Sequence, residues 1–494
     1  MGGFFGVVSK QNCVPDIFFG TDYHSHLGTV RGGMAVLAEG PRFHRAIHDI
    51  ENTQFRTKFD VDFQRFNGLV AKAGIGVISD YDDQPLLIAS HLGVYALVTV
   101  GLVSNVDELV EELYEKNGTH LSELGRGVVN PTEVVAALIN SQDSYAQGIE
   151  YAQKKILGSC SLILLTNKGE MYVGRDRYGR TPVVLGEKEG AYAAAIESCS
   201  FPNLGYKPLR NLGFGEVVKM TVDGVETVVA PTGKRGAICS FIWVYFGYPA
   251  STFDGCNVEQ VRYRCGECLA KRNPVEADSV AGVPDSGVGH ALGYAAEAGI
   301  RYARPFVKYT PTWPRSFMPS DPSMRQHIAQ MKLIPIPELI KGQRLIFCDD
   351  SIVRGTQLRD QVRRLTADGA KEIHMRIACP PLLYKCRFIN FSRSRSVMDL
   401  VTRRVIKEID GDKAEISRYQ DPDSESYKKM VEIIRERLGL TSLAFQRIDD
   451  LKKSIGADAD NLCTYCWTGQ DVSLDSSCAA GCCACDKNCI AKSV

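Results

Sequence analysis

The sequence of 494 residues lacks both an excess of charge of one sign and any long apolar run. Its 58 basic side chains balance 58 acidic ones, so no bulk positive field attracts nucleic acid. No apolar run approaches the roughly 18 residues that a membrane helix needs. The segment Met1–Gly6 has neither the basic region nor the long apolar region of a secretory signal. We therefore expect a cytoplasmic metabolic protein with no nucleic-acid or membrane partner.

Cysteine, in contrast, is abundant, with 17 residues that are distributed unevenly. In a reducing compartment, clustered cysteines are more often metal ligands or catalytic groups than disulfides. Two Cys-x-x-Cys pairs occur, Cys265 with Cys268 and Cys463 with Cys466, and a further cluster spans 478–489. Two such pairs are a common zinc pattern, so a Zn²⁺ site is one reading of the spacing.

The chain divides into parts with different patterns. Residues 1–235 alternate short β-branched or aromatic runs with helical patterns, which is typical of an α+β domain. Residues 236–440 alternate apolar strands with longer amphipathic helices, which predicts an α/β domain with a parallel sheet. Residues 441–494 are predicted to form a short helix and a cysteine-rich coil. The elements expected in the second part are Ser279–Val283, Gly289–Ala298, Leu345–Cys348, Thr356–Ala367 and Glu372–Ala378.

The segment Arg344–Thr356 carries the strongest chemical signal. A buried strand ends in Asp349 and Asp350, and a loop containing Ser, Arg, Gly and Thr then opens a helix. Backbone N–H groups and the dipole at such a helix start bind phosphate. The paired carboxylates suit ribose hydroxyls or a Mg²⁺ ion that bridges to pyrophosphate oxygens. The segment is longer than a simple helix cap requires, so it predicts a phosphate-binding site.

This segment resembles the phosphoribosyl-pyrophosphate (PRPP) loop of type I phosphoribosyltransferases. Ile346–Thr356 in particular resembles the form found in glutamine PRPP amidotransferases. Gly282–Gly287 is similar to that family's pyrophosphate loop, and Lys308 with Thr312–Phe317 is similar to its loop over the active site. Met331–Leu333 is similar to the stretch just beyond. The resemblance covers nearly the whole chain.

The family reaction makes 5-phosphoribosylamine from PRPP with ammonia derived from glutamine, and it opens purine synthesis. The resemblance implies an N-terminal-nucleophile (αββα) glutaminase-type domain followed by a type I phosphoribosyltransferase α/β domain, in a homo-oligomer. The PRPP site that it implies has Ser286, Asp349 and Asp350 near Mg²⁺, Ser351, Arg354, Gly355 and Thr356 at the 5′-phosphate, and Lys308, Arg315 and Lys332 as countercharges.

The first part of the chain is similar to the family's glutaminase domain. The similar segments are Gly3–Val7, Arg31-Gly32, Gln84-Pro85, Arg175–Gly179 and Glu197–Cys199. In the family, removal of Met1 exposes a cysteine whose thiolate attacks the glutamine amide while its own α-amine acts as the base. This chain has Gly2 at that position, and glycine has no nucleophile.

Three further positions of the implied glutamine site differ from the family. Ser79 stands at the place of an arginine for the glutamine carboxylate, and Asn130-Pro131 replaces an acidic residue for its amine. Val100-Gly101 replaces an Asn-Gly pair, so Gly101 of the oxyanion hole is kept but one side-chain donor is lost. We therefore expect impaired glutaminase activity.

Several alternatives stay open at this point. Gly2 is either part of a natural relic or a single change in a working enzyme, and Cys13 is a weaker candidate for a substitute nucleophile because it has no free α-amine. A different class of function is a catalytically silent subunit that binds PRPP or a nucleotide within a purine-pathway complex.

Some family members hold a [4Fe–4S] cluster with four cysteines. Cys239, Cys386, Cys463 and Cys466 stand at the matching positions, so the resemblance implies this cluster beside Mg²⁺ as a second cofactor. The zinc alternative pairs Cys463 and Cys466 with the other Cys-x-x-Cys pair.

Overall fold

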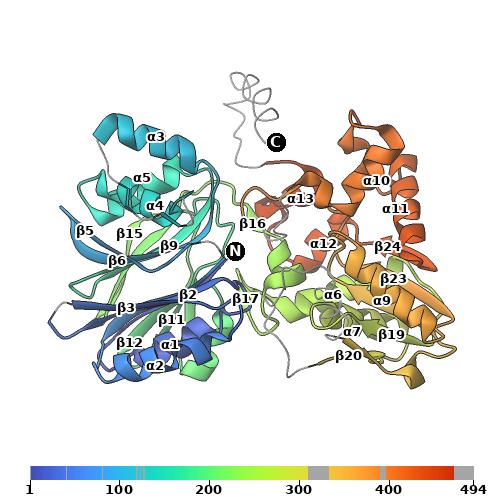
Figure 1. Cartoon of the computed structure of the whole chain (residues 1–494), viewed down its shortest axis with the longest axis horizontal. Helices are drawn as coiled ribbons and strands as arrows, with labels where there is room; N and C mark the ends of the chain where they lie inside the picture. The colour runs from blue at the N-terminus through green and yellow to red at the C-terminus, as the bar shows by residue number, and fades with distance from the viewer. Residues whose placement is uncertain are drawn as a thin grey trace.

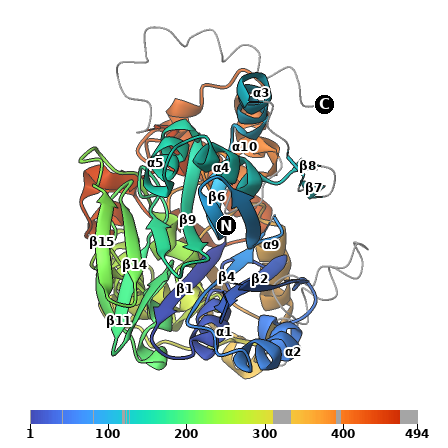
Figure 2. The ribbon, with the colours of Figure 1, turned by 90° about the vertical axis from the view of Figure 1, so that its left-hand side faces the viewer.

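Two antiparallel sheets stack face to face in the first half of the chain, as the computed structural model shows (Figure 1). The structure describes residues 2–40, 42–80, 82–117, 121–122, 124–125, 128–309, 333–389 and 396–471. The strand orders are β13-β11-β12-β1-β4-β2-β3 and β15-β14-β10-β9-β6-β5. Helices α1 and α2 lie outside the first sheet, and α3, α4 and α5 lie outside the second (Figure 1, Figure 2). The predicted αββα architecture is confirmed.

The elements of this half have the following bounds. The first sheet consists of β1 (Gly3–Ser9), β2 (Arg31–Ala38), β3 (Arg42–Asp49), β4 (Ala73–Ser79), β11 (Val184–Lys188), β12 (Ala191–Ala195) and β13 (Lys207–Asn211). The second consists of β5 (Leu86–Ser90), β6 (Gly93–Val103), β9 (Gly158–Thr166), β10 (Met171–Gly174), β14 (Val217–Thr221) and β15 (Gly224–Val229). The helices are α1 (Val14–Asp22), α2 (Phe55–Asn67), α3 (Val106–Asn117), α4 (Pro131–Asn140) and α5 (Tyr145–Lys155), and β7 (Leu124–Gly125) pairs with β8 (Val128–Val129).

Strand β1 is buried on both faces. Phe4 packs in the core between the two sheets, and Phe5 packs in the core under α1 and α2, because successive side chains of a strand point to opposite faces. This is why the strand is an almost continuous apolar run. Its antiparallel register with β4 sets Gly3 opposite Ile78, so Gly2 lies beside the carboxyl end of β4.

The second half is built on a parallel sheet with the order β19-β22-β23-β24. Its strands are β19 (Ser279–Gly282), β22 (Arg344–Asp349), β23 (Glu372–Ile377) and β24 (Ser442–Phe445), flanked by α6 (Val258–Arg272), α7 (Gly287–Ala298), α9 (Thr356–Ala367), α10 (Val401–Asp410) and α11 (Glu425–Leu438). The predicted α/β class is confirmed, and the helix predicted over Thr356–Ala367 has those bounds. Strands β20 (Phe306–Lys308) and β21 (Leu333–Pro335) form a separate two-stranded antiparallel sheet.

The described part of the C-terminal segment, residues 441–471, packs onto the second half, whereas the sequence predicts 441–494 as a separate segment. The cysteine cluster at 478–489 lies outside the described residues. Strand β24 is an edge strand of the parallel sheet, and α12 (Ile448–Ile455) packs against α6. Strand β25 (Leu462–Cys463) pairs in parallel with β16 (Ile238–Cys239), ahead of the short α13 (Tyr465–Thr468). The predicted boundary at residue 235 lies between β15 and β16 and stays a prediction. Within the described residues, no helix is long and apolar enough to cross a membrane.

Candidate functional site

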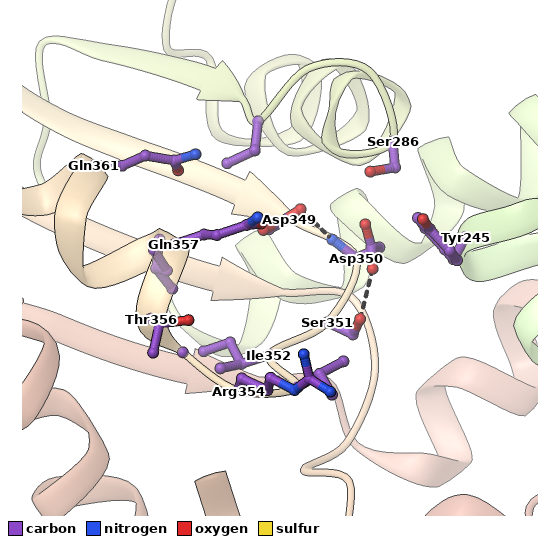
Figure 3. Close-up of a pocket in the computed structure, with 14 residues that line it drawn as sticks. Tyr245, Ser286, Asp349, Asp350, Ser351, Ile352, Arg354, Thr356, Gln357 and Gln361 are labelled. Carbon is purple, nitrogen blue, oxygen red and sulfur yellow. Dashed lines mark hydrogen bonds between the residues drawn. The ribbon is translucent and has the colours of Figure 1, made fainter. Parts of the chain in front are cut away.

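A cavity of about 410 Å³ opens beyond the carboxyl ends of β19 and β22 (Figure 3). Ligands of parallel α/β sheets commonly bind at this edge. Figure 3 shows the loop from Asp349 to Thr356 along one side and Ser286 across from it. The lining residues are Tyr245, Val283, Ser286, Asp349, Asp350, Ser351, Ile352, Val353, Arg354, Gly355, Thr356, Gln357, Leu358 and Gln361.

Two helices begin at this cavity. Helix α7 starts at Gly287, where an added Cβ would lie only 2.3 Å from the backbone oxygen of Cys348, so only glycine lets the helix start approach β22 this closely. Helix α9 starts at Thr356, after Gly355 with a φ of 76°, a left-handed conformation that favours glycine. Both helix N-termini therefore direct the positive end of their dipole towards the same space.

Asp349 and Asp350 are adjacent in the chain, and their surroundings disfavour the ionised form of both carboxyl groups. Burial and the neighbouring charge of Asp350 raise the pKa of Asp349 well above its usual value. Burial also raises the pKa of Asp350, against the opposing effect of hydrogen bonds from Ser286 and Ser351. The Ser351 hydroxyl donates to Asp350 Oδ1 at 2.6 Å, and the Asp350 backbone N–H donates to Asp349 Oδ1 at 2.9 Å. A divalent cation with oxygen ligands would relieve this repulsion.

Tyr245 lines the cavity although sequence reasoning did not find it. It lies in a π-helical turn, Ile242–Phe246, whose apolar and aromatic residues give no sign of a site. Arg262 of α6 fixes this turn, because its buried guanidinium donates to the backbone oxygens of Trp243, Tyr245 and Gly247 at 3.1, 2.8 and 2.8 Å. The one sequence signal for this contact is Arg262 itself, an arginine within the helical segment that follows the turn.

Most of the predicted PRPP residues line this one cavity: Ser286, Asp349, Asp350, Ser351, Arg354, Gly355 and Thr356. Lys308 does not line it. Its ammonium group forms an ion pair with Asp285, which belongs to the loop that ends at Ser286. Arg315 and Lys332 lie outside the described residues.

A second cavity, of about 250 Å³, lies at the head of β1 in the first half. Gly2, Ser79, Val100 and Gly101, which the sequence comparison with the family singles out, all line it. Gly101 has a φ of 135°, and an added Cβ there would lie 2.1 Å from the backbone oxygen of Ser159, so this position requires glycine.

Cys13 is not among the described residues that line the second cavity. This position argues against Cys13 as a substitute nucleophile. It is buried in the core under α1 and α2. Burial and the charge of Asp16 raise the pKa of its thiol far above the usual value, which suppresses the reactive thiolate.

Four cysteines from three separate segments lie close together beside the β16–β25 pair. The register sets Cys239 opposite Cys463. A hydrogen bond with Cys386, then burial and the charges of Cys386, Cys239 and Cys463 raise the pKa of the Cys466 thiol well above its usual value. Burial raises the pKa of Cys463 to about 11, although the positive charge of Arg180 opposes this effect. All four predicted cluster cysteines are thus neighbours.

The two Cys-x-x-Cys pairs have different surroundings, which does not support the zinc pairing predicted as an alternative. Burial raises the pKa of Cys265 to about 12, and its other influences come from Ser454, Cys268, Gln446 and Arg264. Among the residues that the structure describes, no group of three or more His, Cys, Asp or Glu side chains could hold a single metal ion.

Known proteins share both the sequence and the architecture. The chain is 31% identical over 391 residues to the amidophosphoribosyltransferase of Synechococcus elongatus, a match that covers 78% of this chain and 73% of the relative. The chain belongs to the amidophosphoribosyltransferase family. The Methanocaldococcus jannaschii amidophosphoribosyltransferase is 29% identical over 95% of this chain and 97% of its own length. The solved glutamine PRPP amidotransferase of B. subtilis, in complex with ADP and GMP, is similar with a TM-score of 0.80 and 28% identity over 95% of this chain and 96% of that one.

The two cavities differ in their position relative to a further family match. A family model described as a glutamine amidotransferase domain matches residues 72–201. Every described residue that lines the second cavity, except Gly2, falls within this range. The first cavity lies outside the range, in the half that carries the parallel sheet.

Proposed function

We propose that this chain forms 5-phosphoribosylamine from PRPP and free ammonia, and that its glutaminase half is catalytically silent. The observation that carries the proposal is the contrast between the two cavities. The first keeps its paired carboxylates, its hydroxyls and two helix N-termini, whereas the second has Gly2 where the family reaction needs a thiol.

In the proposed reaction, the ammonia nitrogen forms a bond to C1 of the ribose while the bond from C1 to pyrophosphate breaks. The nitrogen loses a proton to solvent, and the electron pair leaves with pyrophosphate. Ser286, Asp349 and Asp350 would hold Mg²⁺, which neutralises charge on the departing pyrophosphate when it is bound. The loop from Ser351 to Thr356 would hold the 5′-phosphate with its backbone N–H groups and hydroxyls. Positioning and exclusion of water are therefore the main contributions of the protein.

The silence of the glutaminase half rests on more than one position. None of the described residues that line the second cavity carries a positive charge, so none of them can pair with the glutamine carboxylate. The Ser79 hydroxyl accepts a hydrogen bond from the Asp82 backbone N–H at 3.2 Å and cannot supply that charge. Val100 adds an apolar side chain where the family has an oxyanion donor.

The test is to measure pyrophosphate release from PRPP and Mg²⁺ with ammonium chloride, and then with glutamine, while glutamate is measured in parallel. We expect release with ammonium only and no glutamate above the background without protein. Robust glutamate formation by the unchanged chain would refute the silent half. Binding of PRPP without turnover from either nitrogen source would instead favour the alternative, a PRPP-binding subunit.

We further propose that Cys239, Cys386, Cys463 and Cys466 hold a [4Fe–4S] cluster. Their convergence supports a large group, since a cluster spaces its ligands more widely than one zinc ion does. Arg180 has one nitrogen left for an anionic group, because its other guanidinium nitrogens contact Asp471 at 3.6 Å and the Gly158 backbone oxygen at 3.0 Å. Its side chain is 1% exposed, it lies 3.9 Å from the Phe388 ring centroid, and its Nε has no hydrogen-bond partner. When bound, such a cluster would supply negative charge and sulfur acceptors beside this guanidinium.

Chemical analysis of anaerobically purified protein checks this proposal. We expect about four iron atoms and four sulfides per chain and a brown colour. Cys463→Ser should lose both, whereas Cys268→Ser, which alters a half-buried cysteine outside the group of four, should keep them. One zinc per chain without sulfide would contradict the proposal.

A further inference from the structure

The second cavity has walls that suit a ligand other than glutamine. Its described lining includes five aliphatic residues, Leu102, Val103, Val106, Val128 and Val129. A polar amide side chain placed against such a wall loses hydrogen bonds to water without replacement, which costs free energy. A ligand with a hydrocarbon body does not incur this loss.

Two polar residues in the lining of the same cavity indicate which polar group the ligand carries. Asp82 contributes a carboxyl group whose pKa is raised to about 6, first by burial and then by the charge of Asp83. Ser159 is 1% exposed, and its Oγ has no hydrogen-bond partner. The lining thus holds one anionic acceptor beside a residue whose buried hydroxyl has no partner, and a ligand carboxylate would be repelled by Asp82.

We propose that this cavity binds a small aliphatic amine, whose ammonium group pairs with the Asp82 carboxylate while its hydrocarbon body packs on the leucine and valine side chains. The cavity volume of about 250 Å³ suits a ligand of a few carbon atoms. The inference rests on the proposed silence of the glutaminase half, because a working half would reserve this cavity for glutamine.

Isothermal titration calorimetry of the full chain, without PRPP, tests the proposal with 3-methylbutan-1-amine hydrochloride as the probe. Two matched compounds isolate its parts: 3-methylbutan-1-ol has the same body without the charge, and leucine adds a carboxylate. We expect the amine to bind at pH 7.5 and each control to bind at least tenfold more weakly.

Variants assign the binding to Asp82. Asp82→Asn should weaken binding of the amine at least tenfold. This variant is expected to fold, because it removes a charge that burial disfavours. Asp83→Asn is the control, since Asp83 is exposed and pairs with Arg31. The affinity of this variant for the amine should stay within about twofold of that of the unchanged chain. Lowering the pH from 7.5 to 5 should weaken binding about tenfold, because a carboxyl group with a pKa of about 6 becomes mostly protonated while the amine stays charged.

Equal binding of the amine and the alcohol, unchanged binding by Asp82→Asn, or no measurable heat at millimolar amine would each overturn the proposal. These outcomes are separate from those of the ammonia assay. Glutamate formation would refute the proposed function. A failed titration together with intact ammonia-dependent turnover would refute only the amine site.

Discussion

Asp349→Asn should abolish PRPP turnover and at the same time make the protein more stable at neutral pH. The activity should fall on the order of 10²-fold or more, because the Mg²⁺–pyrophosphate group in the proposed reaction would lose a charged ligand. The stability rises because the native state raises the pKa of this carboxyl well above its usual value. Above the unfolded pKa, an acid with a raised native pKa destabilises the fold as pH increases, and an asparagine has no such charge.

Ammonium-dependent pyrophosphate release and thermal unfolding at pH 5 and pH 7.5 check this prediction. The gain in melting temperature should be larger at pH 7.5, where the carboxylate of the unchanged chain is more ionised. Asp412→Asn is the matched control, because this side chain is 77% exposed and should leave activity and stability nearly unchanged. A fall in stability at both pH values, with turnover retained, would show that Asp349 is structural.

Gly2→Cys should not restore glutaminase activity. The new Cβ would lie 2.4 Å from the backbone oxygen of Ile78, closer than a side-chain carbon tolerates, so the head of β1 must shift before any thiol fits. Even a thiol in place would face a cavity without a described positive charge for the glutamine carboxylate. We expect glutamate release by this variant to stay at background and its melting temperature to fall below that of the unchanged chain.

Gly2→Ala separates the steric effect from the chemistry, because it adds the same Cβ without a thiol. It should lower the melting temperature about as much as Gly2→Cys does, and ammonia-dependent turnover should persist in both, since the PRPP cavity lies in the other half. Full glutaminase activity of Gly2→Cys would show that Gly2 is a single change in an otherwise working site.

Local sequence signals predicted the parts of the site that are contiguous in the chain. The loop between β22 and α9 follows from a buried strand, two carboxylates and a glycine before a helix, and all these features lie within Arg344–Thr356. The first cavity, which we propose binds PRPP, needs more than this loop. Tyr245 enters it only because Arg262, on the next helix, ties a π-helical turn in place, and no local periodicity encodes that contact.

The C-terminal part shows the same limit. Ser442–Phe445 is too short and too polar at its start for the sequence to identify it as a strand, and it forms β24 because β23 offers a free edge. The cysteine quartet was found through family resemblance, since Cys239 and Cys463 are brought together by a strand pairing that spacing cannot reveal. Spacing by itself pairs Cys463 and Cys466 with Cys265 and Cys268, whose surroundings in the structure are different.

The parallel pairing of β16 with β25 also fixes an order of events during synthesis. Ser240, which follows β16, donates a hydrogen bond to the backbone oxygen of Cys463, 223 residues later. Contacts of such long sequence separation form late and slowly. Strand β16 therefore emerges from the ribosome without its partner and waits until β25 has been made. Any cofactor that needs all four thiols can enter only after this closure, so its delivery must follow translation of the second half.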